Sequence, residues 1–493
     1  MANNNNIARS VAGGVAWMLL LRMSLRMLGL VSTVILARLL TPADFGLVAI
    51  AMSFFALLHL FKDFGFDTVI IQMQQPAREH YDTAWTFNII FGVCLAILLV
   101  CFSGVIANFY NTTDLQPLIW AVASLFIIGG LGNVATLDFR KNLTFEKEFK
   151  LKFLPKLIGV PCTLILAFWL RNYWALTIGT IVTSISGLCI GYMMHSYRPK
   201  LSLSAAKELF NFSKWLMANN FIYFINNRSP ELFIGKVINP EAAGLFSVAN
   251  EVAMTTTTEF SAAVSRATYP GYAKVANSAT DLKNLYLNVI SSSALLLFPM
   301  AIGVFSITDL LVPVFLGDQW LSTIPIIKII VIAGLLMALG SNTGYVFMAA
   351  GNPRMSTILG ASRMVVFIPC LLYLLKTHGL IGAAWSILLT ALFIFFVSNL
   401  IILNKLSIRV SEIATAIFRP FLGCVIMILI LNKFLELATQ TSIQDIWLLS
   451  LAVFLGAAVY FTAIFSLWYV SGRPLGPETK IYQMIIRAKK VTG

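Results

Sequence analysis

The sequence predicts an all-α protein that crosses a membrane many times, and three observations indicate this fold class. Hydrophobic residues make up 58% of the 493 residues and charged residues only 11%, whereas soluble domains carry about 25% charged residues. Apolar runs of about 20 residues, the length that crosses a bilayer as a helix, recur along the chain. Runs such as 89–102 and 448–468 lack the alternating polarity of barrel strands. A polytopic helical bundle is therefore expected.

The apolar runs and the turns between them predict fourteen transmembrane helices. Turn signals such as Thr41-Pro42, Asn239-Pro240 and Gly351-Asn352-Pro353 separate neighbouring runs. The predicted spans are 10–38, 44–73, 82–108, 115–138, 153–171, 173–195, 212–237, 241–265, 285–312, 322–350, 355–376, 379–404, 413–435 and 445–470.

Lysine and arginine residues gather in the loops on one side of the predicted membrane. The largest groups lie in 139–156, 196–214 and 266–283 and in the tail that follows the last span. Because positively charged loops remain in the cytoplasm, both termini are expected there. The net charge of +14 is therefore interpreted as a signal of topology, and no nucleic-acid partner is expected.

One turn occurs twice. Pro42 and Gly46 recur 198 residues later as Pro240 and Gly244, each followed by leucine. Six predicted spans separate the two copies, so both have the same orientation, as in transporters built from parallel repeats. The predicted domains are an N-terminal lobe at 1–195, a cytoplasmic linker at 196–211, a C-terminal lobe at 212–404, and a segment at 405–493 with the last two spans and a cytoplasmic tail.

Arg22 and Arg26 interrupt the first apolar run. They are four residues apart and share one face of the predicted helix. A charge at bilayer depth costs roughly 2.5–3.5 kcal/mol on insertion scales and usually lines a cavity or a pathway. A guanidinium can hold phosphate oxygens with paired donors. We expect both arginines to bind an anionic substrate. A structural ion pair and snorkelling towards the interface are the alternatives.

Asn219, Asn226 and Arg228 make the predicted span 212–237 unusually polar. The two asparagines lie about two turns apart, so one face of the helix is polar. Pro230 is expected to interrupt the helix, as in the discontinuous helices near transport sites. Substrate binding is the functional hypothesis for the three polar residues, and hydrogen bonding between helices by the asparagines is the alternative.

Acidic residues inside the predicted spans are candidates for coupling transport to a cation gradient. They are Asp63, Glu231, Glu251 and Glu259. A buried carboxylate favours its neutral form and can exchange a proton, although Glu231 can instead neutralise Arg228. Lys328 and Arg363 are secondary basic candidates.

The sequence contains no motif for a bound cofactor or metal. No G-x-x-x-x-G-K-[ST] loop occurs, so direct use of ATP is not expected. The six cysteines lie in apolar runs without a C-x-x-C pair. No cofactor or metal is therefore expected, and a proton or sodium gradient is the expected energy source.

An ordered set of motifs resembles that of a known family. The motifs are Leu39-Leu40-Thr41-Pro42-Ala43-Asp44-Phe45-Gly46-Leu47, Asp63-Phe64-Gly65, Ile234-Gly235 before Asn239-Pro240 and Gly244-Leu245, Tyr269-Pro270, and the segment from Val312 to Trp320. With them the chain resembles the polysaccharide transporter (Wzx-type, colanic-acid-exporter-like) family of the multidrug/oligosaccharidyl-lipid/polysaccharide (MOP) flippase superfamily. The resemblance implies two pseudo-symmetric six-helix lobes around a central cavity, with two extra C-terminal helices.

The resemblance also implies a function. An undecaprenyl-diphosphate-linked oligosaccharide is expected to cross the bacterial inner membrane by alternating access, for exopolysaccharide, capsule or lipopolysaccharide synthesis. The expected partners are this lipid-linked substrate, the bilayer and a polymerase or export complex, and no enzymatic activity is expected. The first alternative is a small-molecule, multidrug-type exporter of the same superfamily, although basic span residues suit an anionic headgroup better than a cationic drug. The second is a membrane glycosyltransferase or polymerase, which the absence of a D-x-D motif disfavours.

Overall fold

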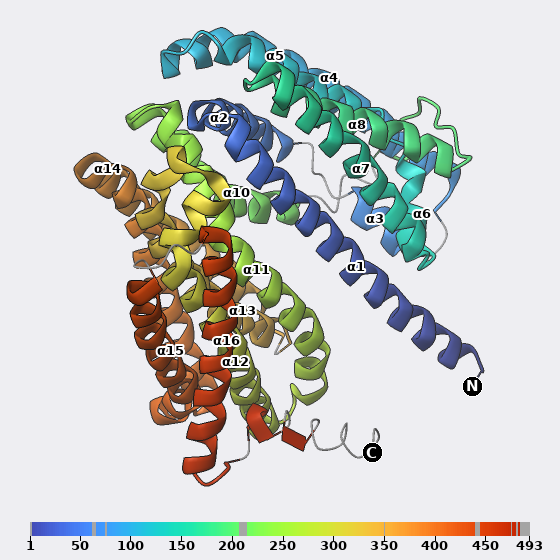
Figure 1. Cartoon of the computed structure of the whole chain (residues 1–493). Helices are drawn as coiled ribbons and strands as arrows, with labels where there is room; N and C mark the ends of the chain where they lie inside the picture. Colours follow the sequence, from blue (N-terminus) through green and yellow to red (C-terminus); the bar gives the residue numbers. More distant parts are fainter. Residues whose placement is uncertain are drawn as a thin grey trace. The chain divides into compact units, whose positions relative to one another are not determined.

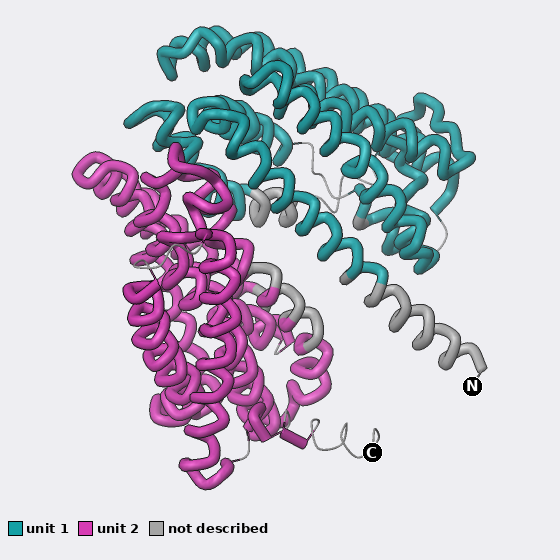
Figure 2. Tube along the Cα trace, in the orientation of Figure 1, with its two compact units in different colours: residues 1–245 teal, residues 246–493 magenta. Residues whose placement is uncertain are grey.

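The computed structural model is built from helices, and no strand occurs among the residues it describes. These are residues 2–61, 66–73, 76–206, 214–349, 351–438, 444–474, 476–479 and 482–483. The chain divides into two compact units, Met1–Leu245 and Phe246–Gly493 (Figure 2). The predicted all-α fold class is confirmed.

The first unit is formed by helices that pack mainly in pairs. α7 packs against α8, α4 against α5, α1 along α7, and α10 on α2. Leu36 and Leu40, at the end of α1, are buried beside Ala167 of α7 and Ala175 of α8. The elements, labelled in Figure 1 where space allows, are α1 (Ala2–Leu39), α2 (Pro42–His59), α3 (Phe66–Gln72), α4 (Arg78–Tyr110), α5 (Leu115–Gly130), the 3₁₀ helix η1 (Val134–Leu137), α6 (Asp138–Lys141), α7 (Phe145–Leu170), α8 (Trp174–Met194), α10 (Lys214–Val237) and the first turn of α11 (Pro240–Val275).

The turn between α1 and α2 is fixed by its own side chains. The Asp44 backbone N–H donates to the Thr41 hydroxyl, and the Thr41 N–H donates to the Asp44 carboxylate at 2.9 Å. This reciprocal pair is a capping box, and Pro42 stands at the start of the helix, where its missing N–H costs nothing. The other oxygen of Asp44 accepts from the Tyr173 N–H at 2.8 Å, which ties the turn to the start of α8. In the second copy, the Asn239 side chain accepts from the Ala242 N–H at 2.7 Å.

The second unit contains most of α11 and all later helices. α12 packs against α13 and α15, α13 against α14, and α15 against α16. Tyr272 and Tyr286 lie in one apolar core with Phe347 and Ile402, and Trp320 is fully buried. The remaining elements are α12 (Ala279–Leu311), the π-helical turn η2 (Val312–Leu316), the 3₁₀ helix η3 (Asp318–Thr323), α13 (Ile324–Ala349), α14 (Pro353–Leu406), α15 (Val410–Ala438) and α16 (Asp445–Val470).

α14 joins two predicted spans. Its 54 residues would reach about 80 Å as a straight helix, far more than the roughly 30 Å of a bilayer core. Gly379 departs from helical geometry with φ 59° and ψ −140°, which only glycine adopts easily. The break lies at the predicted boundary between the spans 355–376 and 379–404.

The membrane-spanning character of the chain is confirmed, whereas the number of spans is not. Among the described residues, ten helices are long and apolar enough to cross a membrane, or eleven if the pair Leu115–Gly130 and Val134–Lys141, bent by 71°, forms one span. α10 and α11 are not among them, because they carry the polar residues that make them functional candidates. The count of fourteen stays a prediction. So do the lobe boundaries, and in the structure α10 belongs to the first compact unit.

Candidate functional site

Arg22 and Arg26 lie on the side of α1 opposite the row of exposed apolar residues on this helix. The row contains Met23 and Met27, which are 69% and 64% exposed, whereas both arginines are half-buried. At about 100° per residue, the arginines lie well outside this row. The Nε atom of Arg26 is enclosed and has no hydrogen-bond partner. Arg26 is therefore a charged donor whose Nε atom has no acceptor among the residues that the structure describes.

The polar segment of α10 satisfies part of its hydrogen bonding within its own helix. The Asn226 and Asn227 amides donate to the carbonyl oxygens of Ile222 and Tyr223 at 2.9 and 2.8 Å, and the Ser229 hydroxyl donates to Ile225 O. The interruption expected at Pro230 does not occur, because α10 runs without a break from Lys214 to Val237. Proline adopts helical φ, so the helix continues through Pro230 although one N–H donor is lost and the ring crowds the carbonyl group one turn earlier.

Glu231 is more enclosed than Glu251, the other predicted acidic residue whose side chain the structure describes. It is 2% exposed, and its Oε2 atom has no hydrogen-bond partner. Arg228 lies three residues earlier on the same helix, is exposed, and interacts electrostatically with the carboxylate. Burial disfavours the ionised form of a carboxylate, and a nearby positive charge favours it. Glu231 is thus placed to change its protonation state when its surroundings change.

The segment after Glu231 is held firmly by two neighbouring helices. Tyr110 of α4 donates its hydroxyl to Leu232 O at 3.0 Å, and Lys236 Nζ donates to Phe109 O at 2.5 Å. Gly235 packs against Ile50 of α2 and Tyr110. α10 is therefore attached to α2 and α4, whereas the arginines lie on α1, which packs along α7. Arg228 and Glu231 form one group and Arg22 and Arg26 another, on different helix pairs.

The other predicted residues are described only in part. Glu251 is half-buried on α11 and interacts with other groups. Asn219 and Glu259 lie on α10 and α11, but their side chains are outside what the structure describes. Asp63 falls outside the described residues altogether. Within the described part of the chain, no group of three or more His, Cys, Asp or Glu residues is arranged to hold a metal ion.

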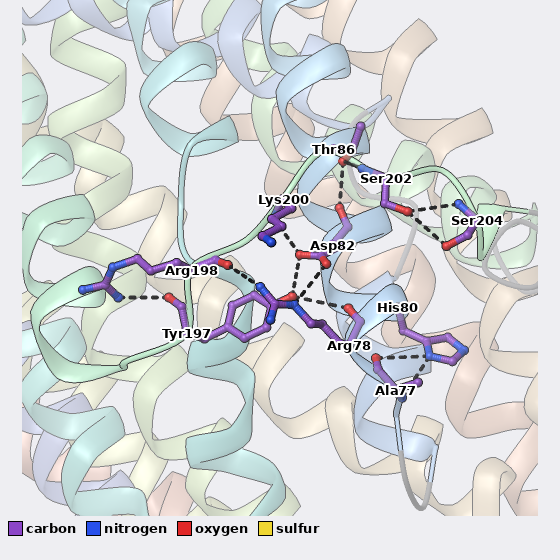
Figure 3. A network of polar contacts seen from close by, with 10 residues as sticks. All are labelled: Ala77, Arg78, His80, Asp82, Thr86, Tyr197, Arg198, Lys200, Ser202 and Ser204. Carbon is purple, nitrogen blue, oxygen red and sulfur yellow. Dashed lines mark hydrogen bonds and ion pairs between the residues drawn. The ribbon is translucent and has the colours of Figure 1, made fainter.

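A polar network that the sequence did not reveal anchors the chain after α8 to the start of α4 (Figure 3). The Asp82 carboxylate accepts from the Tyr197 hydroxyl at 2.6 Å and the Lys200 N–H at 2.7 Å, and pairs with Arg78 at 3.4 Å. The Thr86 hydroxyl oxygen accepts from the Ser202 N–H at 2.9 Å. Burial and the bond to Asp82 raise the pKa of the Tyr197 hydroxyl. The only sequence signal was an i, i+4 pair, Arg78 and Asp82, which does not reveal partners about 115 residues away.

Comparison with known proteins places the chain in a family. A family model described as polysaccharide biosynthesis protein matches residues 35–325. The chain belongs to this family. Two relatives support the assignment over more of the chain. Lipopolysaccharide biosynthesis protein WzxC of Escherichia coli (strain K12) is 26% identical over 388 residues, 78% of this chain and 79% of WzxC. Teichuronic acid biosynthesis protein TuaB of Bacillus subtilis (strain 168) is 23% identical over 461 residues, 92% of this chain and 95% of TuaB.

Solved structures show that this member of the polysaccharide biosynthesis family has a known transporter fold. The lipid II flippase MurJ, in an inward closed conformation, matches with a TM-score of 0.75 at 15% identity, over 92% of this chain and 100% of the MurJ chain. An inward-facing multidrug resistance MATE transporter of the MOP superfamily matches with a TM-score of 0.54 at 15% identity, over 79% and 99%. These likenesses confirm the predicted transporter-like fold.

Proposed function

We propose that this protein moves an undecaprenyl-diphosphate-linked oligosaccharide from the cytoplasmic to the outer leaflet of the bacterial inner membrane. Its family membership supports a role in polysaccharide biosynthesis. The observation that carries the proposal is the enclosed Nε of Arg26, for which the described residues provide no acceptor. A diphosphate supplies several acceptor oxygens, and an arginine can bind two of them at once.

The substrate contacts are assigned to residues of α1 and α10. Arg22 lies one turn before Arg26, so both can address one headgroup. Arg228 is exposed, so its guanidinium is accessible to an anion. Asn219 and Asn226 are proposed to contact the sugar hydroxyls. The polyprenyl chain remains in the lipid phase, where its burial costs nothing.

Glu231 is proposed as the residue that couples transport to a cation gradient. When Arg228 binds the substrate, the anion neutralises its charge. Arg228 then stabilises the ionised carboxylate of Glu231 less. The enclosed Glu231 then favours its neutral, protonated form. Substrate release would reverse this change and return the proton. Asp63, Glu251 and Glu259 remain candidates for further coupling residues.

In the proposed orientation, both termini lie in the cytoplasm. Alternating access of the two lobes moves the substrate across the membrane. A polymerase or export complex is proposed as a protein partner. A reporter that is active only in the cytoplasm should work when fused after Lys214. A reporter that needs the periplasm should work when fused after Leu437. Activity of the opposite reporters at these positions would reverse the topology.

Transport by the purified full chain tests the proposal directly. Proteoliposomes receive an undecaprenyl-diphosphate-linked oligosaccharide with a fluorophore on the sugar, and a membrane-impermeant quencher reports the outer leaflet. The protein should accelerate exchange between leaflets, and a cationic dye, rhodamine 6G, should not accumulate. Dye transport without movement of the lipid would replace the proposal by the multidrug-type alternative.

A further inference from the structure

One predicted span of the first unit is broken, and a cavity lies at the break. α5 ends at Gly130 and η1 begins at Val134, and the two segments are bent by 71°. The cavity has a volume of about 300 Å³ and lies between this break, α4, α7, α8 and the start of α3. Non-helical backbone at membrane depth is tolerated where it is buried in protein or lines a polar cavity. A cavity at a broken span is therefore a candidate for ligand binding.

Neighbouring side chains fix the shape of the break. The carbonyl oxygen of Leu131 accepts from the Tyr192 hydroxyl at 2.9 Å and from the Trp85 Nε1 atom at 3.4 Å. The Asn133 side chain accepts from the Ala135 N–H at 3.1 Å, which caps η1. These bonds hold the break in one conformation, and with it one wall of the cavity.

Glycines leave space on the α8 side of the cavity. A Cβ atom on Gly187 would lie 3.6 Å from Pro155, and one on Gly191 would lie 3.7 Å from Leu151. Both are ordinary van der Waals distances, so alanine would fit at each position and helix packing does not require glycine there. Protein interiors are otherwise closely packed. The two glycines thus keep open a space that small apolar side chains could fill.

Polar side chains converge on this space from four elements. Besides Asn133, they are Asp67 of α3, Asn88 of α4, Thr136 of η1 and Ser184 of α8. The Asn88 side chain makes no hydrogen bond to another residue in the described part of the chain. The Thr136 and Ser184 hydroxyls donate to backbone carbonyl groups of their own segments at 2.8 and 3.0 Å, so each oxygen atom can still accept from a ligand. The cavity therefore offers both donors and acceptors.

The lining indicates the chemistry of the ligand. Among the described residues that line the cavity there is no lysine or arginine, so it offers a phosphate no positive side chain. It offers a metal ion only one carboxylate, that of Asp67, which is exposed. Amide, carboxylate and hydroxyl groups together can pair with neighbouring hydroxyl groups of a neutral sugar. The volume lies at the lower end of the range for small-molecule sites, roughly 300–1,000 Å³, which suits one sugar residue and not a whole oligosaccharide.

We propose that this cavity binds one sugar residue of the lipid-linked oligosaccharide, and that Asn88 and Asp67 contribute to the choice of sugar. The inference rests on the proposed function and extends it, because it assigns recognition of the sugar to a site that no arginine lines. A site that forms hydrogen bonds to a sugar discriminates against a ligand without one, because its polar groups then lose their partners. The diphosphate and the sugar are thus bound by different residues of the first unit.

Binding of defined lipids to the full chain in detergent tests the inference. The probes are undecaprenyl diphosphate and its glucose, galactose and N-acetylglucosamine derivatives, and calorimetry measures their affinities. At least one glycosylated lipid should bind about tenfold more tightly than undecaprenyl diphosphate. N88L should remove this preference, because leucine is similar in size to asparagine and forms no hydrogen bonds. N108L is the matched control, because Asn108 is exposed on the same helix, and it should keep the preference.

A second variant guards against a loss of folding. D67N changes an exposed side chain and should reduce the same preference severalfold. Equal affinities of the unmodified protein for all four lipids, or an unchanged preference in both N88L and D67N, would overturn the inference and leave the cavity to water. A fall by the same factor for all four lipids in these variants would show a purely structural effect, and would overturn it equally.

Leaflet exchange separates this inference from the proposed function. Exchange of a lipid-linked oligosaccharide without any preference that depends on Asn88 would overturn the inference alone. Conversely, a preference that depends on Asn88 without any leaflet exchange would refute the proposed function alone.

Discussion

Gly46 and Gly244 occupy equivalent places in a reciprocal contact between the two copies of the repeated turn. A Cβ atom on Gly46 would overlap the carbonyl oxygen of Pro240, and a Cβ on Gly244 would overlap that of Pro42. Each glycine thus lies against the proline that begins the other copy's helix. The 198-residue offset between the turns therefore has a physical meaning: the two copies meet face to face, related by an approximate two-fold axis. Only glycine allows the backbones to approach this closely.

Replacing Gly46 or Gly244 by alanine should destabilise the protein by about 1–3 kcal/mol, because backbone must move to make room for the methyl group. Thermal unfolding of the purified protein measures the loss, and leaflet exchange should slow in parallel. Gly29→Ala in α1 is the control, because a Cβ there meets nothing within 4 Å. Equal stability of the Gly46 and Gly29 variants would show that the contact is not tight in solution.

Arg26→Met should reduce leaflet exchange of the lipid-linked oligosaccharide at least tenfold, because the headgroup loses a charged, bidentate contact. Removal of a donor without a protein partner should leave the unfolding temperature unchanged or raise it. Arg38→Met, at the exposed end of the same helix, should transport at nearly the normal rate. The hypothesis fails if Arg26→Met is as active as Arg38→Met.

Local features of this chain were predictable because they depend on residues close in sequence. The pairing of Thr41 with Asp44, the shared face of Arg22 and Arg26, and the break at Gly379 all follow from spacing and residue type. Such features involve one turn of helix or one φ angle, which the local sequence determines. The prediction that Pro230 interrupts the helix was wrong. A helix can continue through a proline when its other backbone hydrogen bonds remain intact.

Long-range contacts were not predictable from the same patterns. The bond from Tyr197 to Asp82 and the bond from Tyr110 to Leu232 each join residues more than 100 positions apart. Hydropathy shows that a helix crosses the membrane, but it does not show which other helix it packs against. The lipid and all neighbouring helices present similarly apolar surfaces. For the same reason the sequence does not show that the Nε atom of Arg363 has no hydrogen-bond partner among the described residues.

Glu231→Gln should abolish the dependence of transport on a proton gradient, because glutamine keeps the shape of the side chain and cannot titrate. Leaflet exchange in proteoliposomes with an imposed pH difference should accelerate in the unmodified protein and remain flat in the variant. Glu241→Gln, an exposed change in the first turn of α11, is the matched control and should respond normally. Preserved acceleration in Glu231→Gln would assign the proton coupling to another titratable residue.

Asp82→Asn should loosen the segment from Tyr197 to Ala205 from α4. The change removes the charge that pairs with Arg78 and weakens two hydrogen bonds, from the Tyr197 hydroxyl and the Lys200 N–H. Loss of such buried, charge-assisted bonds costs about 1–3 kcal/mol each. Brief trypsin treatment should therefore cut after Lys200 faster than in the unmodified protein. Glu79→Gln, on the exposed side of the same helical turn, should leave the cleavage rate unchanged. Because this segment joins α8 to α10, its release should also lower the rate of leaflet exchange. A normal exchange rate in a variant that trypsin cuts faster would show that transport does not depend on this connection.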